Sequence, residues 1–134
     1  MDLQLSNRTC LITGASQGIG KGTARVMAAE GCRIAILARR KALLDELADE
    51  IAETGATRPQ VIDEDITEEG APERIRDRVY DSLGGLDVLV NCAGGFVWQV
   101  VIAEHHAVAA RAQLALPVVA QLLAAVGIHQ LDFN

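Results

Sequence analysis

The fold of this chain is decided by one stretch, Leu11-Ile12-Thr13-Gly14-Ala15-Ser16-Gln17-Gly18-Ile19-Gly20. The residues from 8 to 12 form a short, mostly apolar run that is typical of a strand, and residues 19–30 carry apolar side chains at helical spacing. Between them the backbone must turn sharply. The free N–H groups at the start of the helix, aided by the helix dipole, then form a binding site for an anion. The stretch therefore predicts a site for the pyrophosphate of a dinucleotide.

Each glycine of the turn has its own role in this prediction. Gly14 and Gly18 have no side chain to obstruct the approach of the phosphates, and Gly20 permits close packing of the helix against the strand. An ordinary tight turn is the simpler alternative. The strand–turn–helix context favours the phosphate site over that alternative.

The chain beyond this turn alternates between strand and helix patterns. Further strands are predicted over residues 32–38, 60–67 and 86–90, and further helices over residues 41–54 and from about 67 to the Gly84-Gly85 pair. Gly55 is expected to end the first of these helices, and Pro72 falls in the first turn of the second. Such alternation predicts an α/β fold with a parallel sheet and helices on both faces.

The T-G-x-x-x-G-I-G spacing of residues 13–20 resembles the short-chain dehydrogenase/reductase family. Asp65-Ile66-Thr67 and Asn91-Cys92-Ala93-Gly94 follow in the family's order, so the resemblance is specific over residues 5–95. It implies a Rossmann-type doubly wound parallel sheet, truncated after about four strands and four helices. Residues 1–134 would form a single, incomplete NAD(P)-binding domain in which residues 96–134 are a divergent tail.

The resemblance and the glycine turn together assign a set of cofactor-binding residues. In the family, an Asp at the position of Asp65 contacts the adenine ring, and the Asn-x-Ala-Gly motif stabilises the central sheet and lines the cofactor cleft. The expected cofactor-binding residues are Gly14, Ser16, Gln17, Gly18, Ile19, Gly20, Arg39, Arg40, Asp65, Ile66, Asn91, Ala93 and Gly94.

The end of the second strand favours NADP over NAD as the cofactor. An NAD site usually places Asp or Glu there, to accept a hydrogen bond from the ribose 2′-hydroxyl. This chain has Ala38 followed by Arg39 and Arg40, which removes repulsion against a 2′-phosphate and offers a charge-assisted contact to it. Ser16 can donate a further hydrogen bond. The alternative is that both arginines are solvated residues before a helix.

No catalytic residue can be assigned in this sequence. The family uses a Tyr, a Lys four residues later and an upstream Ser, but the single tyrosine, Tyr80, has Gly84 four residues later, and the two lysines are Lys21 and Lys41. The family-level expectation is an NADP-dependent oxidoreductase that transfers hydride between a carbonyl and an alcohol substrate. The alternatives are a catalytically silent NADP-binding or dimerising module, and a non-functional product that is truncated or read out of frame after about Val97.

Composition excludes several other classes. A net charge of −6 argues against nucleic-acid binding, and the start of the chain lacks the pattern of a signal peptide. Three cysteines without framework spacing favour a cytoplasmic protein.

Residues 107–126 are read as a long helix that buries its apolar surface in the fold or in a homo-oligomer, rather than as a membrane span. No metal site is expected, because no Cys or carboxylate cluster accompanies the adjacent histidines His105 and His106 at ligand spacing.

Overall fold

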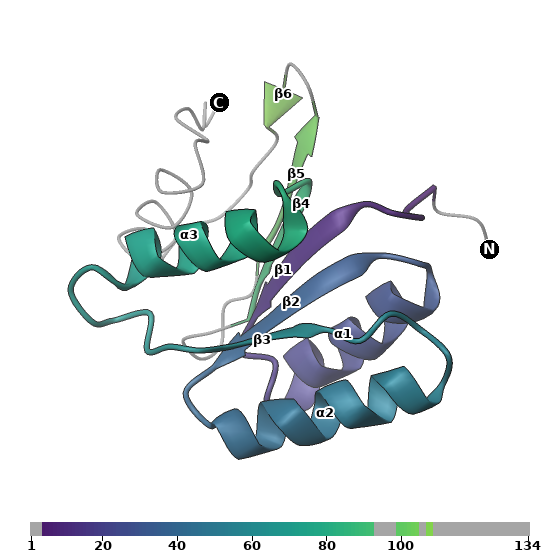
Figure 1. The fold of residues 1–134 in the computed structure, drawn as a ribbon. Coiled ribbons are helices and arrows are strands. Elements are labelled where there is room, and N and C mark those ends of the chain that lie inside the picture. The colour runs from purple at the N-terminus through teal and green to yellow at the C-terminus, as the bar shows by residue number, and fades with distance from the viewer. Residues whose placement is uncertain (1–3, 93–98, 105–106, 109–134) are drawn as a thin grey trace.

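Four parallel strands form the centre of the fold in a computed structural model, which describes residues 4–92, 99–104 and 107–108 (Figure 1). They are β1 (Thr9–Thr13), β2 (Arg33–Ala38), β3 (Gln60–Asp63) and β4 (Val88–Asn91). Their order in the sheet is β3-β2-β1-β4, so β1 lies between its two parallel neighbours β2 and β4. All five residues of β1 are buried, as a central strand covered on both faces requires.

Three helices cover the two faces of this sheet in the described part of the chain. In Figure 1, α1 (Gly18–Ala29) and α2 (Lys41–Glu53) lie on one face, and α3 (Ala71–Leu83) lies on the other. Strand residues alternate between the two sides. Ile12 and Ile36 pack with α1 and α2, whereas Leu11 and Leu37 pack with α3. The predicted Rossmann-type arrangement of parallel strands and helices on both faces is confirmed.

Each helix contributes an apolar stripe to the core. In α2 the buried side chains are those of Leu44, Leu47, Ala48 and Ile51, at helical spacing, and the acidic residues lie on the other side. Gly55 follows the end of α2 with a φ of 89°, which is the left-handed conformation that ends many helices. Pro72 lies in the first turn of α3 as predicted.

The stretch between β3 and α3 differs from the prediction. β3 ends at Asp63 instead of continuing to residue 67, and α3 begins at Ala71 instead of near residue 67. The Asp65 carboxylate accepts hydrogen bonds from the backbone N–H of Thr67 at 2.9 Å and from its hydroxyl at 2.6 Å. This local side-chain bonding stabilises a turn in place of a strand or helix.

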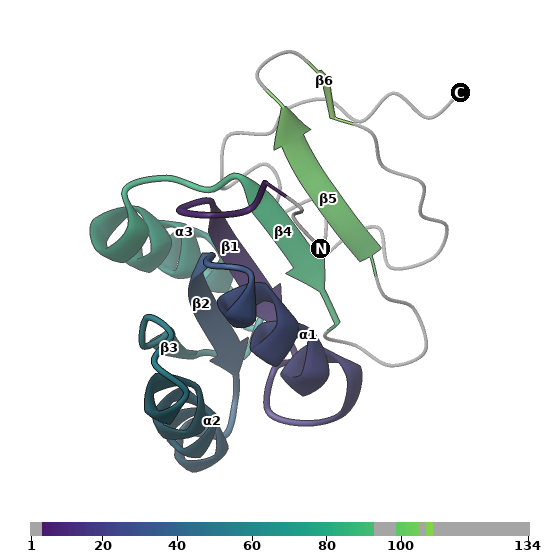
Figure 2. The same cartoon turned by 90° about the vertical axis from the view of Figure 1, so that its right-hand side faces the viewer.

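After β4 the sheet continues with antiparallel strands, which the sequence analysis did not predict. Figure 2 shows β5 (Gln99–Glu104) beside β4, and β6 (Ala107–Val108) pairs with β5. Asn91 and Gln99 are too close in sequence for a parallel crossover, which needs about a dozen residues or more. The predicted helix over residues 107–126 is therefore wrong for Ala107 and Val108, which pair with β5 as strand residues. Its other residues lie outside the described part of the chain.

Candidate dinucleotide-binding site

The described residues that were predicted to bind the cofactor lie at or just beyond the ends of the four parallel strands. Thr13, Ala38, Asp63 and Asn91 are the last residues of β1, β2, β3 and β4. Because the strands are parallel, the loops that follow them meet at one edge of the sheet. In open α/β sheets this edge is where ligands bind.

The glycine turn between β1 and α1 has the close backbone packing that the sequence predicts. Gly14 and Gly18 adopt φ values of 64° and 59°. A Cβ atom added at Gly20 would lie 2.8 Å from the carbonyl carbon of Gly14 and 3.2 Å from the Cα of Ala15, so only glycine allows α1 to pack this closely against the turn. The N–H of Ala15 also donates to the carbonyl oxygen of Leu37 at 3.2 Å, which anchors the turn to β2.

The first turn of α1 offers uncapped N–H groups at this edge. Gln17 precedes the helix in an extended conformation, and no side chain accepts a hydrogen bond at the N-cap position. Gln17, Gly18 and Ile19 are exposed, with Ile19 at 55%. An anion placed here would satisfy these donors and would lie at the positive end of the helix dipole. The structure of the turn thus fits a dinucleotide pyrophosphate.

Asn91 is tied to β1 by a buried hydrogen bond. The Thr13 hydroxyl donates to the side-chain carbonyl of Asn91 at 2.5 Å, and the same hydroxyl accepts the backbone N–H of Cys92 at 3.1 Å. Thr13 and Asn91 are 0% and 4% exposed. The residues at the start of the Asn-x-Ala-Gly motif are therefore fixed relative to the glycine turn. Ala93 and Gly94, which complete the motif, lie outside the described residues.

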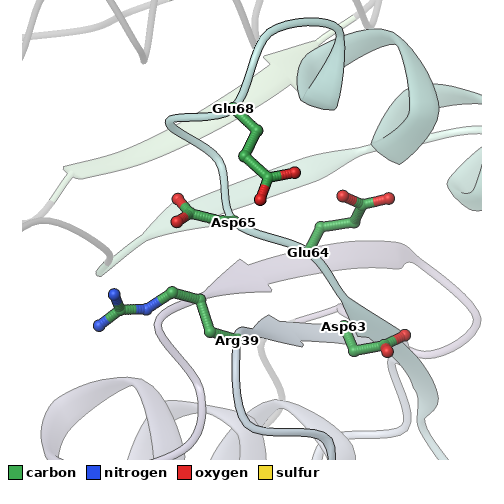
Figure 3. A pocket seen from close by; sticks show the side chains of 5 residues that line it. All are labelled: Arg39, Asp63, Glu64, Asp65 and Glu68. Carbon is green, nitrogen blue, oxygen red and sulfur yellow. The ribbon is translucent and has the colours of Figure 1, made fainter.

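Arg39 lines a hollow of about 300 Å³ with four acidic residues, Asp63, Glu64, Asp65 and Glu68, shown in Figure 3. Within the described part of the chain, no hydrogen bond or ion pair within 4 Å engages the Arg39 guanidinium. It extends from the end of β2 away from Asp63 and Glu64 (Figure 3). Arg40 does not line the hollow, and its carbonyl oxygen accepts the N–H of Leu44 in the first turn of α2.

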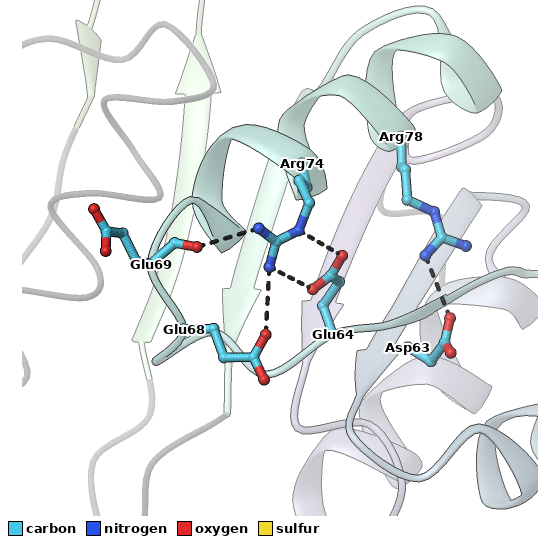
Figure 4. A network of polar contacts seen from close by, with 6 residues as sticks. All are labelled: Asp63, Glu64, Glu68, Glu69, Arg74 and Arg78. Carbon is cyan, nitrogen blue, oxygen red and sulfur yellow. Dashed lines mark hydrogen bonds and ion pairs between the residues drawn. The ribbon is translucent and has the colours of Figure 1, made fainter.

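Three of the four carboxylates are held by arginines of α3 (Figure 4). Arg74 binds Glu64 through two parallel hydrogen bonds of 3.1 Å, and it also contacts Glu68 at 3.5 Å. Arg78 donates to Asp63 at 3.3 Å and to the carbonyl oxygen of Val61 at 3.0 Å. This network was not predicted from the sequence, because its members come from separate elements. Only the clustering of acidic residues near 63–69 and arginines near 74–78 hinted at it.

Asp65, the fourth carboxylate of the hollow, is stabilised in its charged form. The hydrogen bonds from Thr67 hold the pKa of Asp65 below its ordinary value, and the charge of Arg39 acts in the same direction. Ile66 is partly buried and packs against the core beneath α3. Asp65 therefore lies beside Arg39 as a hydrogen-bond acceptor, while Ile66 anchors the loop.

Neither a metal site nor a membrane-spanning helix is found among the described residues. Over residues 4–92, 99–104 and 107–108 there is no group of three or more His, Cys, Asp or Glu side chains placed to hold a metal ion. No helix in that same part of the chain is long and apolar enough to cross a membrane. Tyr80 lies on α3 and is 41% exposed. The histidines, and the segment with the predicted long helix beyond Val108, lie outside the described residues.

Comparison with known proteins places this site in a family. The family model for short chain dehydrogenases matches residues 8–128. A short chain dehydrogenase of Pseudocercospora fijiensis is 41% identical over 92 residues, which are 68% of this chain and 29% of that protein. The 1,6-dihydroxycyclohexa-2,4-diene-1-carboxylate dehydrogenase of Pseudomonas putida is 36% identical over 98 residues, which are 73% of this chain and 35% of that protein.

A solved structure shows the same fold. The L-sorbose reductase of Gluconobacter frateurii, complexed with NADPH and L-sorbose, superposes with a TM-score of 0.76 at 28% identity, covering 94% of this chain and 48% of that one. The chain spans about a third of the length of the curated relatives that it matches. The family match covers most of the chain and includes the glycine turn and the strand ends, so this chain belongs to the short chain dehydrogenase family.

Proposed function

We propose that this chain is the cofactor-binding part of an NADP-dependent oxidoreductase that transfers hydride between a carbonyl and an alcohol. The observation that carries the proposal is the Arg39 guanidinium at the end of β2, which makes no hydrogen bond or close ion pair with the described residues. Ala38, which precedes it, brings no carboxylate to the place where NAD sites have one. The similarity to a reductase complexed with NADPH supports it. Residues 1–134 would belong to one Rossmann domain with residues 96–134 as its tail. Three free cysteines favour a reducing, cytoplasmic location.

The residues of the site have separate roles in this function. The backbone N–H groups from Ser16 to Gly20 bind the pyrophosphate. Gly14 and Gly18 let it approach, and Gly20 lets α1 pack against the turn. Arg39 receives the 2′-phosphate, together with its sequence neighbour Arg40 and with Ser16 of the glycine turn. When bound, NADPH supplies the hydride.

The other predicted residues bind the adenine ring or fix the loop that follows β4. Asp65 and Ile66 receive the adenine ring, as the family resemblance implies. Asn91, held by Thr13, fixes the start of the Asn-x-Ala-Gly motif, and Ala93 and Gly94 would line the nicotinamide half of the cleft. These 134 residues bind and orient the cofactor. We assign none of them a role in proton transfer.

Titration of the chain with NADPH and NADH tests the cofactor preference. Replacing Arg39 by Asp is expected to weaken NADPH binding by about tenfold or more, because a charge-assisted contact becomes a repulsion, with little change for NADH. Arg33→Ala, at the opposite end of β2, removes a positive charge far from the site and should change neither affinity. Equal binding of both dinucleotides, or an unchanged NADPH affinity in Arg39→Asp, would contradict the proposal.

A second candidate is a dinucleotide-binding or dimerising module without catalysis. In this candidate the 134 residues, which contain no Tyr-x-x-x-Lys stretch, act through binding alone. An assay of the chain with NADPH and a panel of ketones and aldehydes separates the two candidates, because turnover requires a proton donor. The third alternative, out-of-frame residues after Val97, is disfavoured by the family match, which runs to residue 128.

A further inference from the structure

We propose that Arg74 is a positioning residue for cofactor selection, which holds the Glu64 carboxylate against α3 and thereby leaves Arg39 available for a 2′-phosphate. This inference rests on the proposed function and adds a determinant that lies outside the glycine turn and the end of β2. It starts from the hollow that Arg39 lines together with four carboxylates. An anion-binding arginine in such surroundings requires something that keeps the carboxylates away from it.

Glu64 is the carboxylate whose direction depends most on Arg74, because Asp65, which lies beside Arg39, is held by hydrogen bonds from Thr67. The backbone N–H of Glu64 donates to the carbonyl oxygen of Ala38 at 3.2 Å, so the main chain of Glu64 is fixed beside the residue that precedes Arg39. The two side chains line the same hollow. Rotation of the Glu64 side chain toward Arg39 would place a negative charge where the 2′-phosphate is proposed to bind.

Arg74 holds the Glu64 side chain in the other direction, as Figure 4 shows. Its Nε and Nη2 atoms donate to the two carboxylate oxygens at 3.1 Å each, while Nη1 donates to the carbonyl oxygen of Glu69 at 3.2 Å. The Glu64 side chain is only 15% exposed, against 46% for Arg74. A bidentate pair with an additional backbone contact fixes orientation better than a single exposed ion pair does.

Release of the Glu64 side chain from Arg74 would change the affinities for NADPH and NADH differently. Beside Arg39, the carboxylate would compete with a 2′-phosphate, which lowers the affinity for NADPH. The same carboxylate would stand near the end of β2, where NAD sites place an acidic residue to accept from the 2′-hydroxyl. Affinity for NADH should therefore hold or rise, and the preference for NADPH should fall.

The test compares the ratio of the NADH and NADPH dissociation constants in the 134-residue chain and its variants, measured by calorimetric titration. Arg74→Ala is expected to lower this ratio by about tenfold, the scale of one hydrogen-bonded charge near a surface. Arg76→Ala is the matched control, because Arg76 lies on the same helix, carries the same charge and pairs with Asp77. It should leave the ratio within about twofold, since the exposed Arg76 charge is paired with Asp77 and does not contact Glu64.

A second substitution separates positioning from local charge. In the Arg74→Ala background, Glu64→Gln should restore the ratio, because a neutral amide no longer competes with the phosphate. Glu68→Gln restores the same net charge, but it leaves Glu64 free and should not restore the ratio. Equal recovery with both would show that only local charge matters and would overturn the inference.

The remaining outcomes are also decisive. A wild-type chain that does not prefer NADPH overturns the proposed function, and this inference with it. A wild-type preference that survives Arg74→Ala overturns the inference alone. If circular dichroism shows that Arg74→Ala is unfolded, Arg74→Lys is measured instead, because lysine keeps the charge but cannot form the bidentate pair of hydrogen bonds with Glu64. An unchanged ratio in a folded Arg74→Lys variant contradicts the inference, and a lowered one supports it.

Discussion

The Thr13 hydroxyl donates a buried 2.5 Å hydrogen bond to the side-chain carbonyl of Asn91, and so joins the ends of β1 and β4 at the edge where the cofactor is proposed to bind. The same hydroxyl accepts the N–H of Cys92. Both side chains are shielded from water, so a partner left alone would not be compensated by solvent. This pair connects the glycine turn with the Asn-x-Ala-Gly motif.

Thr13→Val should therefore lower the free energy of unfolding. Valine keeps the shape of the side chain but leaves Asn91 without this donor, at a cost of about 1–3 kcal/mol. Urea unfolding followed by circular dichroism measures the change. Thr23→Val is the matched control, because the Thr23 hydroxyl bonds the carbonyl oxygen of Ile19 on the exposed side of α1. Equal effects in the two variants would contradict a special role for the Thr13–Asn91 pair.

Two glycines of α1 should respond to alanine in opposite ways. Gly20→Ala would force a methyl group against the backbone of Gly14, so we expect a loss of stability of about 2 kcal/mol or more and loss of dinucleotide binding. A Cβ at Gly22 meets nothing within 4 Å. Gly22→Ala should thus stabilise the chain by about 0.5–1 kcal/mol through helix propensity, and binding should be kept.

Thermal unfolding and NADPH titration of both glycine variants check this prediction. A Gly20→Ala variant that keeps its stability would mean that α1 does not pack against the turn as closely as the structure has it. A destabilised Gly22→Ala variant would mean that this side of α1 is covered.

The Asp65 carboxyl should titrate below its ordinary pKa of 3.8, since Thr67 donates two hydrogen bonds to its charged form. The sign follows from linkage: the stabilisation is present above the unfolded value of 3.8 and is lost as the pH falls through the lower folded value. Thr67→Val removes the hydroxyl donor and should raise the pKa of Asp65. Carboxyl chemical shifts followed by NMR during an acid titration measure both values. An Asp65 that titrates normally in the wild type would contradict the turn seen between β3 and α3.

The sequence predicted those parts of the fold and site that depend on local pattern. The glycine turn, the apolar stripe of α2 and the loss of a carboxylate at Ala38 can all be read from neighbouring residues, because each is set by backbone geometry or helical period. The hydrogen-bonded pair of Arg74 and Glu64 could not be predicted from neighbouring residues. It depends on how α3 is placed over the sheet, which no local spacing specifies.

The antiparallel strand β5 was missed for a different reason. The predicted helix began only at residue 107, and the β-branched run Val100-Val101-Ile102 within Gln99–Glu104 is too short to indicate a strand by itself. Pairing with β4 decides the conformation there, since β4 would otherwise be an unpaired edge of the sheet. Such pairing between distant segments is not specified by a short local pattern.

The three cysteines should differ in reactivity because they differ in burial. Cys10 and Cys32 are 0% and 1% exposed, whereas Cys92, next to Asn91, is only partly buried. Burial raises the pKa of all three thiols, so the reactive thiolate is scarce at neutral pH. Iodoacetamide at pH 7.5 should modify the folded chain slowly and at Cys92 first, as mass spectrometry of its peptides can show.

The pH dependence of this labelling has a definite sign. Raising the pH increases the thiolate fraction at Cys92, so its labelling accelerates, while Cys10 and Cys32 stay protected until denaturant unfolds the chain. Unfolded thiols ionise at a lower pH than these buried ones do, so the free energy of unfolding should also decrease as the pH rises above the ordinary thiol pKa of about 8.5. Labelling of Cys10 or Cys32 as fast as Cys92 in the folded chain would contradict their place in the core beneath α1.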